Sequence, residues 1–122
     1  MRIVIWLCGL VVCASLSPAW AESAVPAEQT GLLSDTEWFA LATKNNCLFC
    51  HAIDHKVVGP AYKDVAAAYA GKADMEEKLV KKVSEGGGGH WGEEAMPSQS
   101  PPATQKEIRA LLRYILSLKK SP

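Results

Sequence analysis

The clearest hydrophobic pattern lies near the C-terminus, where apolar residues recur every three or four positions. They are Ile108, Leu111, Leu112, Ile115 and Leu118. This spacing places them on one face of a helix. Thr104 and Glu107 can form a capping box, in which each side chain bonds the backbone N–H of the other residue. The pattern predicts an amphipathic helix that begins after Thr104 and ends near Leu118.

A second capping box, Ser34 with Glu37, marks the start of an earlier helix over residues 35–45. Leu33 and Trp38 occupy the two positions of a hydrophobic staple around this start. The capping box therefore predicts where the helix begins, and Trp38 indicates which face is buried.

Two further helices are predicted in the middle of the chain. Residues 60–71 are bounded by Pro60, which suits the first turn of a helix, and by Gly71, which ends one. Residues 73–85 carry apolar side chains at helical spacing, and four glycines then end the helix. We expect four or five short helices, a long loop over residues 86–102 and no strand, which is an all-α fold.

Two features bear on function: the long loop, and the small number of apolar side chains on the predicted helices. A loop of more than about 15 residues is uncommon in a small domain and is usually functional. A chain of this size often needs a disulfide, a metal or a cofactor to complete its core. We therefore expect a bound group inside the helices.

The first residues have the features of a secretory signal peptide. Arg2 is positively charged, residues 3–12 are apolar but too few to cross a bilayer, and Ala19 and Ala21 fit the small-x-small cleavage rule. We expect residues 1–21 to be removed on export to the periplasm. An uncleaved membrane anchor is the alternative.

After cleavage, residues 22–33 would form a flexible leader and residues 34–120 the folded domain, with no membrane span. The exported chain of 101 residues holds 12 Lys+Arg and 13 Asp+Glu, a net charge of −1. This balance argues against a nucleic-acid partner, and no basic run suggests a membrane surface.

The exported chain keeps two cysteines, Cys47 and Cys50, and His51 follows them directly. The C-x-x-C-H spacing is typical of c-type haem attachment. Each thiol adds to one vinyl group of the porphyrin, and one helical turn brings the two thiols to about the spacing of the vinyls. His51 then lies under the iron and can bind it. The motif predicts one covalent haem c.

Three other uses of a C-x-x-C motif are known. A thioredoxin-like redox pair is expected in a βαβ context, which the pattern does not show. A zinc site could be completed by His55 and His90, but His51 would then have no role. A plain disulfide is also possible in an exported protein.

The sixth position of the iron could be taken by one of four side chains or by none. His55 is too near His51 in the chain to reach the opposite face of the ring, and Met75 belongs to the apolar stripe of a helix. His90 fits a surface position better. Met96 lies in the long loop, which can wrap the far face, and the proline after it stiffens the backbone. Met96 is the predicted ligand, and a His/Met pair raises the reduction potential and closes the iron to substrates.

The segments NNCLFCHAIDHKVVGPAYKDVAAAYAGKA and HWGEEAMPSQSPPAT resemble the small periplasmic class I cytochromes c. The resemblance covers nearly the whole predicted domain and implies short helices wrapped around one haem. It implies thioether bonds at Cys47 and Cys50, with His51 and Met96 as the axial ligands. Proteins of this family carry electrons to nitrite reductases and terminal oxidases.

Two further roles and two departures follow from the resemblance. Pro60 corresponds to a proline whose carbonyl accepts the N–H of the proximal imidazole, and Trp91 to a tryptophan that bonds a haem propionate. The family often has asparagine near the methionine sulfur where this chain has Gln99. It often has an aromatic residue where this chain has Ala42, so the contact between the first and last helices must be built differently, and we expect Trp38 to help fill it.

The sequence therefore predicts a one-electron carrier with a covalent haem c, whose partners are redox proteins, and not an enzyme. One alternative is the haem subunit of a periplasmic dehydrogenase complex, for instance a sulfite-oxidising one. Another is an open iron site, as in a peroxidase or a gas sensor, which Met96 argues against.

Overall fold

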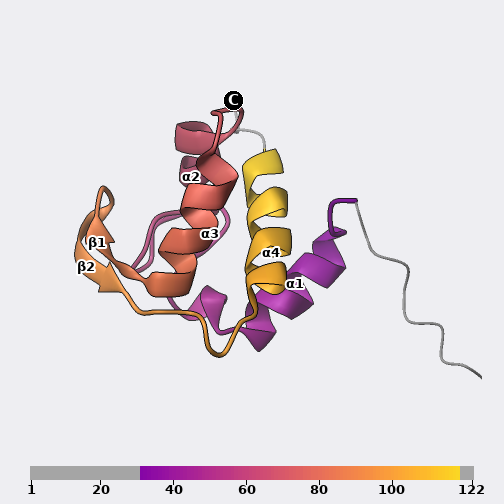
Figure 1. Ribbon diagram of the computed structural model, residues 1–122, viewed down its shortest axis with the longest axis horizontal. Helices are drawn as coiled ribbons and strands as arrows, with labels where there is room; N and C mark the ends of the chain where they lie inside the picture. The colour runs from indigo at the N-terminus through magenta and orange to yellow at the C-terminus, as the bar shows by residue number, and fades with distance from the viewer. Residues whose placement is uncertain (1–30, 119–122) are drawn as a thin grey trace, which may run out of the picture.

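The computed structural model describes residues 31–118, so the predicted signal peptide and most of the predicted leader lie outside the described residues. The elements follow in the order α1 (Asp35–Lys44), a 3₁₀ turn (Cys47–Phe49), α2 (Tyr62–Tyr69), α3 (Met75–Glu85), β1 (Gly87–Gly89), β2 (Gly92–Met96) and α4 (Gln105–Ser117). All four predicted helices are present. In Figure 1, α4 lies beside α3, α1 crosses near the start of α4, and the strands lie at the opposite edge of the molecule.

Both predicted capping boxes are formed. The Ser34 hydroxyl accepts the backbone N–H of Glu37, whose carboxylate accepts the N–H of Ser34. Thr104 and Glu107 make the same pair of bonds at the start of α4. Glu107 also accepts a bond from Lys44 of α1 at 2.7 Å, and this partner, with Thr104, lowers the pKa of Glu107 to about 2. The sequence signals therefore fix where α1 and α4 begin.

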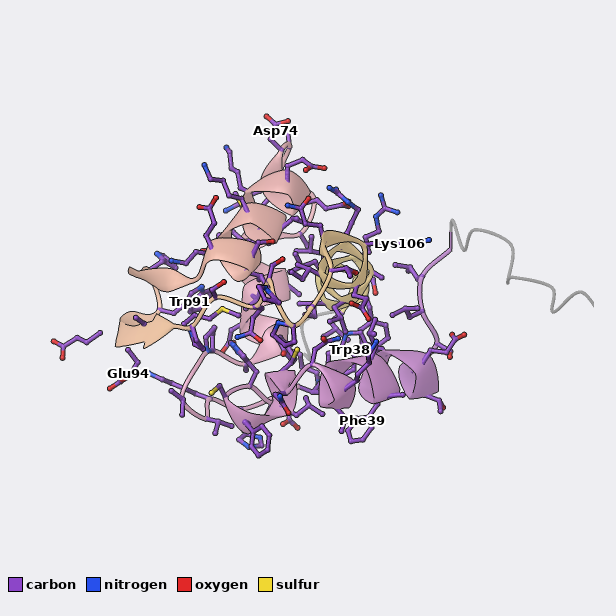
Figure 2. The ribbon with its side chains drawn as sticks, turned by 60° about the horizontal axis from the view of Figure 1, so that its bottom comes forward. Trp38, Phe39, Asp74, Trp91, Glu94 and Lys106 are labelled. Carbon is purple, nitrogen blue, oxygen red and sulfur yellow. The ribbon has the colours of Figure 1, made fainter. Side chains whose placement is uncertain are left out.

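Trp38 fills the contact between α1 and α4, as predicted. It is 2 % exposed, and its indole N–H donates to the carbonyl of Leu111 at 3.3 Å. Its ring stacks on Tyr114 of α4, with 4.9 Å between centroids. Figure 2 shows Trp38 between the two helices, with Phe39 on the outer side of α1. Ala42 is fully buried in the same apolar cluster as Trp38.

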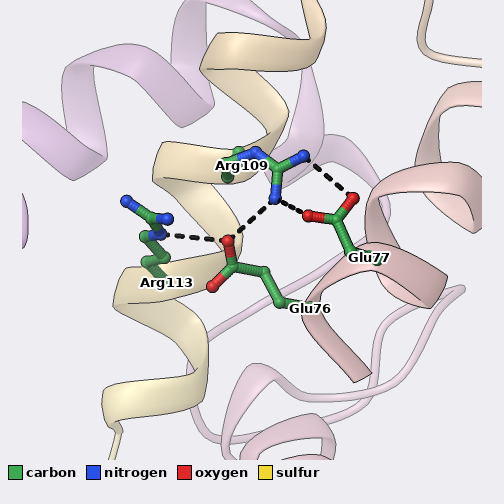
Figure 3. A network of polar contacts seen from close by, with 4 residues as sticks. All are labelled: Glu76, Glu77, Arg109 and Arg113. Atoms are coloured by element: carbon green, nitrogen blue, oxygen red, sulfur yellow. Dashed lines mark hydrogen bonds and ion pairs between the residues drawn. The ribbon is translucent and has the colours of Figure 1, made fainter. Parts of the chain in front are cut away.

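Charged side chains join α3 to α4 (Figure 3). Arg109 donates to both Glu76 and Glu77, and Arg113 donates to Glu76 at 3.0 Å. Hydrogen bonding to Arg109 lowers the pKa of Glu77. The network holds the two helices together at the surface, while their apolar faces meet below it.

The prediction of no strand is wrong, because residues 86–102 contain a small antiparallel hairpin. Gly87 pairs with Met96 and Gly89 with Gly92, so that two residues form the turn. Strand β1 consists of three glycines and has no side chains that could alternate between two faces. Hydrophobic periodicity therefore gives no signal for it.

Within residues 31–118, none of the helices combines the length and the apolar character needed to span a bilayer.

Candidate haem-binding site

The cysteine motif follows a sharp turn at the end of α1. Asn46 has φ 58°, in the left-handed region that asparagine tolerates better than most residues. The 3₁₀ turn then begins, with the backbone N–H groups of Cys50 and His51 both donating to the carbonyl of Cys47, at 3.3 and 3.1 Å. The two cysteines are therefore separated by a single tight turn, and His51 leaves that turn at once.

A short loop holds the imidazole of His51. Its Nδ1 lies 2.8 Å from the carbonyl oxygen of Pro60. A carbonyl oxygen can only accept a hydrogen bond, so Nδ1 carries a proton, and in the neutral tautomer the lone pair then lies on Nε2. A Cβ on Gly59 would lie 2.3 Å from Cε1 of the same ring. The loop thus fixes both the tautomer and the position of the ring, which suits Nε2 for binding a metal.

A cavity of about 360 Å³ opens between the motif, the four helices and the hairpin. Its volume falls within the range of about 300–1,000 Å³ that is usual for cofactor sites. Each helix contributes apolar side chains to its lining, among them Trp38, Val65, Leu79 and Leu111. The cavity is therefore the centre of the helical packing.

The structure brings all six predicted site residues to this cavity. Its lining includes Cys47, Cys50, His51, Pro60, Trp91 and Met96. Both cysteines are half-buried free thiols. Met96 ends strand β2 and is half-buried, and Trp91 lies in the turn of the hairpin, edge-on to Tyr69 with 6.0 Å between ring centroids. Within the described part of the chain, the indole N–H of Trp91 has no hydrogen-bond acceptor.

The side chains that the sequence argued against lie elsewhere or face solvent. The His55 side chain is 71 % exposed and bonds Asp54, and neither His55 nor Met75 lines the cavity. His90 does line it, from the turn of the hairpin, but is exposed and packs edge-on to Trp91. Among residues 31–118, no three side chains of the metal-binding types His, Cys, Asp and Glu come together, which counts against the zinc alternative.

Burial raises the pKa of two groups at the cavity, the Cys47 thiol and the Tyr62 hydroxyl. It raises the pKa of the Cys47 thiol, against smaller opposing effects of a backbone hydrogen bond and of the Tyr62 hydroxyl. Burial also raises the pKa of Tyr62, whose ring lies parallel to that of His51 at 5.0 Å. At neutral pH both groups are therefore neutral, as an apolar cavity requires.

Three residues at the cavity were missed from the sequence. Nothing in the sequence pattern links Gly59 to the site, although the His51 ring lies against it. Tyr62 of α2 and Lys82 of α3 also line the cavity, and Lys82 donates to the carbonyl of Gly88 at 2.6 Å. Helical periodicity places Tyr62 and Lys82 on faces of α2 and α3, but it does not say which faces meet at a cavity.

These residues fit haem c. Two free thiols at C-x-x-C spacing can form its thioethers, an imidazole whose Nδ1 bonds Pro60 can bind its iron through Nε2, and apolar side chains from four helices can cover its ring. The geometry defines a small, mainly helical c-type haem domain.

Comparison with known proteins supports the assignment of a c-type haem domain. The cytochrome c family model matches residues 39–119. Cytochrome c-551 of Allochromatium vinosum is 48 % identical over 79 residues, which are 64 % of this chain and 82 % of that protein. The crystal structure of wild-type Nitrosomonas europaea cytochrome c552 superposes with a TM-score of 0.63 at 44 % identity, covering 66 % of this chain and 99 % of that one.

The chain belongs to the cytochrome c family. The predicted class I cytochrome c fold is confirmed, with the hairpin as an addition to its helices. The protein is an electron carrier with covalently bound haem c, and not an enzyme.

The contact between His51 and Gly59 can be tested by Gly59→Ala. The added methyl group would overlap the imidazole ring, which its bond to Pro60 holds in place. Overpacking of this kind costs about 1–3 kcal/mol, so we expect the melting temperature of the haem-loaded protein to fall by at least about 4 °C. Gly31→Ala is the matched control, since its Cβ would have no neighbour within 4 Å. Equal stability of the two variants would show that the ring does not lie against Gly59.

Proposed function

We propose that this protein is a periplasmic one-electron carrier in which His51 and Met96 are the axial ligands of the iron, with thioether bonds at Cys47 and Cys50. The observation that carries the proposal is the apolar cavity lined by both ligands, with the His51 tautomer set by Pro60. The periplasmic location is supported by the signal-peptide features of the sequence.

His51 and Pro60 act together on one side of the cavity. The hydrogen bond at Nδ1 holds the ring in one orientation and makes Nε2 a stronger donor to a metal. Because Pro60 has no backbone N–H and a restricted φ, its carbonyl is held in a stiff segment just before α2. The ligand therefore needs little rearrangement when the charge of the site changes.

Met96 acts on the other side. A thioether is a soft, uncharged ligand that favours ferrous over ferric iron. With both axial positions held by protein side chains, substrates such as peroxide find no open position, which supports an electron carrier and argues against the open-iron alternative.

Haem c would supply the one-electron iron couple. The apolar side chains of the four helices exclude water from the site, and the free indole N–H of Trp91 is placed to donate to a propionate. Bonds of this kind to an anionic group are stronger than those between neutral groups.

The choice of methionine can be tested with Met96→Ala. We expect the ferric protein to lose the long-wavelength absorption band of thioether ligation and the ferrous protein to bind carbon monoxide. We also expect the reduction potential to fall by on the order of 0.1 V or more, within the roughly 0.8 V that axial ligands span. Met75→Ala is the matched control, because Met75 does not line the cavity. If Met75→Ala has these effects and Met96→Ala has none, the assigned ligand is wrong.

Docking of redox partners is expected at the apolar rim of the cavity. Phe49 and Val58 line the cavity yet are 78 % and 49 % exposed, and the neighbouring Val57 is 46 % exposed. The predicted exported charge of −1 is too small for strong long-range steering. Transient redox interfaces are small, under about 1,200 Å², so a few apolar side chains can supply much of the contact.

This docking surface predicts a weak dependence on salt. Raising the ionic strength from roughly 10 to 200 mM, which shortens the screening length several-fold, should change the rate of electron transfer to a native partner less than about twofold. Val58→Glu should slow that rate by about tenfold, the equivalent of about 1.4 kcal/mol. Phe39→Glu is the control, since Phe39 is 59 % exposed but does not line the cavity. A tenfold effect of salt would contradict the apolar docking surface.

A further inference from the structure

We infer that the C-terminal end of α3 positions Met96, and that Ser98 is the side chain that holds it there. This inference rests on the proposed ligation by Met96. Ser98 itself does not line the cavity, so it would act only through the backbone that carries the methionine.

The end of α3 is closed by the segment that follows Met96. The last carbonyls of a helix have no partner within the helix. Here the Val83 carbonyl accepts the backbone N–H of Gln99 at 3.1 Å, and the Ser84 carbonyl accepts the hydroxyl of Ser98 at 2.6 Å. Figure 1 shows the chain after β2 running past this end of α3 towards α4. Two residues just beyond Met96 are therefore tied to the helix.

Gly86 lets the two segments approach each other. It directly follows α3 and has φ 76°, a conformation that favours glycine. A Cβ at this position would lie 2.5 Å from the carbonyl oxygen of Met96 and 2.6 Å from the backbone nitrogen of Ser98. These are backbone atoms that cannot rotate away. The close approach thus fixes the methionine backbone from the side of the hairpin as well.

The Gln99 side chain is also used within this segment. Its Nε2 donates to the carbonyl of Pro97 at 3.1 Å, which closes a small ring of atoms directly after Met96. The resemblance to class I cytochromes c implies an asparagine at this position, where this chain has Gln99. In this chain the hydrogen bonds of residues 98 and 99 to α3 supply the constraint, and the Gln99 amide reinforces the backbone.

A thioether can leave the iron only if its side chain or its backbone moves. The bonds from Ser98 and Gln99 limit the backbone motion, so the Ser98 hydroxyl should slow the release of Met96. In the bond between Ser98 and Ser84, the acceptor is the backbone carbonyl of Ser84 and not its side chain. The Ser98 hydroxyl also lies 3.4 Å from the carbonyl oxygen of Ser100, but it has one hydrogen and the bond to Ser84 is much the shorter. The contribution of Ser98 is therefore about that of one hydrogen bond.

The test measures how fast imidazole displaces Met96 in the ferric, haem-loaded protein. At saturating imidazole the observed rate becomes the rate at which the thioether is released, and the long-wavelength band of thioether ligation reports it. We expect Ser98→Ala to raise this limiting rate about fivefold, the change that one typical hydrogen bond supports. Ser98→Thr, which keeps the hydroxyl, should stay within about twofold of the parent.

Ser100→Ala is the matched control in the same loop. Its side chain makes no hydrogen bond with residues 31–118, so the limiting rate should not change. If Ser98→Ala leaves the rate unchanged, or if Ser100→Ala raises it equally, the positioning role of Ser98 is wrong while the ligation by Met96 stands. If Met96→Ala keeps the thioether band, the proposed ligation itself is wrong, and the two failures are thereby distinguished.

Discussion

The four helices of this protein meet around one apolar cavity, and their packing depends on what fills it. Leu111 of α4 illustrates the constraint, because its backbone carbonyl bonds Trp38 in the buried contact with α1 while the residue also lines the cavity. The same surface thus serves the protein core and the cofactor site. Helices this short are only marginally stable alone, and a domain of this size has little core to spare. Filling the cavity is therefore a condition for the fold as well as for electron transfer.

The two proposed ligands, which both line the cavity, are positioned by different means. His51 is positioned locally, by the turn that carries the cysteines and by Gly59 and Pro60 eight and nine residues later. Met96 belongs to a segment that long-range contacts fix against the end of α3. Substitutions around His51 should therefore act on this proposed ligand through its hydrogen bond and ring position. Substitutions in the segment tied to α3 should act on Met96, the other proposed ligand, through backbone motion.

Much of this could be predicted from the sequence, because several signals are local. Capping boxes involve residues three apart, and both gave the correct helix starts. The cysteine motif places two haem-attaching thiols and an iron-binding imidazole within five residues, so it indicated a haem c site without any knowledge of the fold. The hairpin could not be predicted, since a strand of glycines has no pattern. The contact of Gly59 with His51 and that of Gly86 with the Met96 backbone depend on tertiary approach, and a glycine in the sequence does not say what it lies against.

The most direct test of the account is the unfolding of the double variant Cys47→Ala/Cys50→Ala, which cannot hold covalent haem. Its far-ultraviolet circular dichroism and its chemical denaturation should be compared with those of the haem-loaded parent. If the cofactor completes the core, the variant should lose most of its helical signal and show no cooperative transition, since an open apolar cavity leaves the four helices without their common contact. A variant that stays fully helical and unfolds cooperatively, with no haem bound, would contradict the claim.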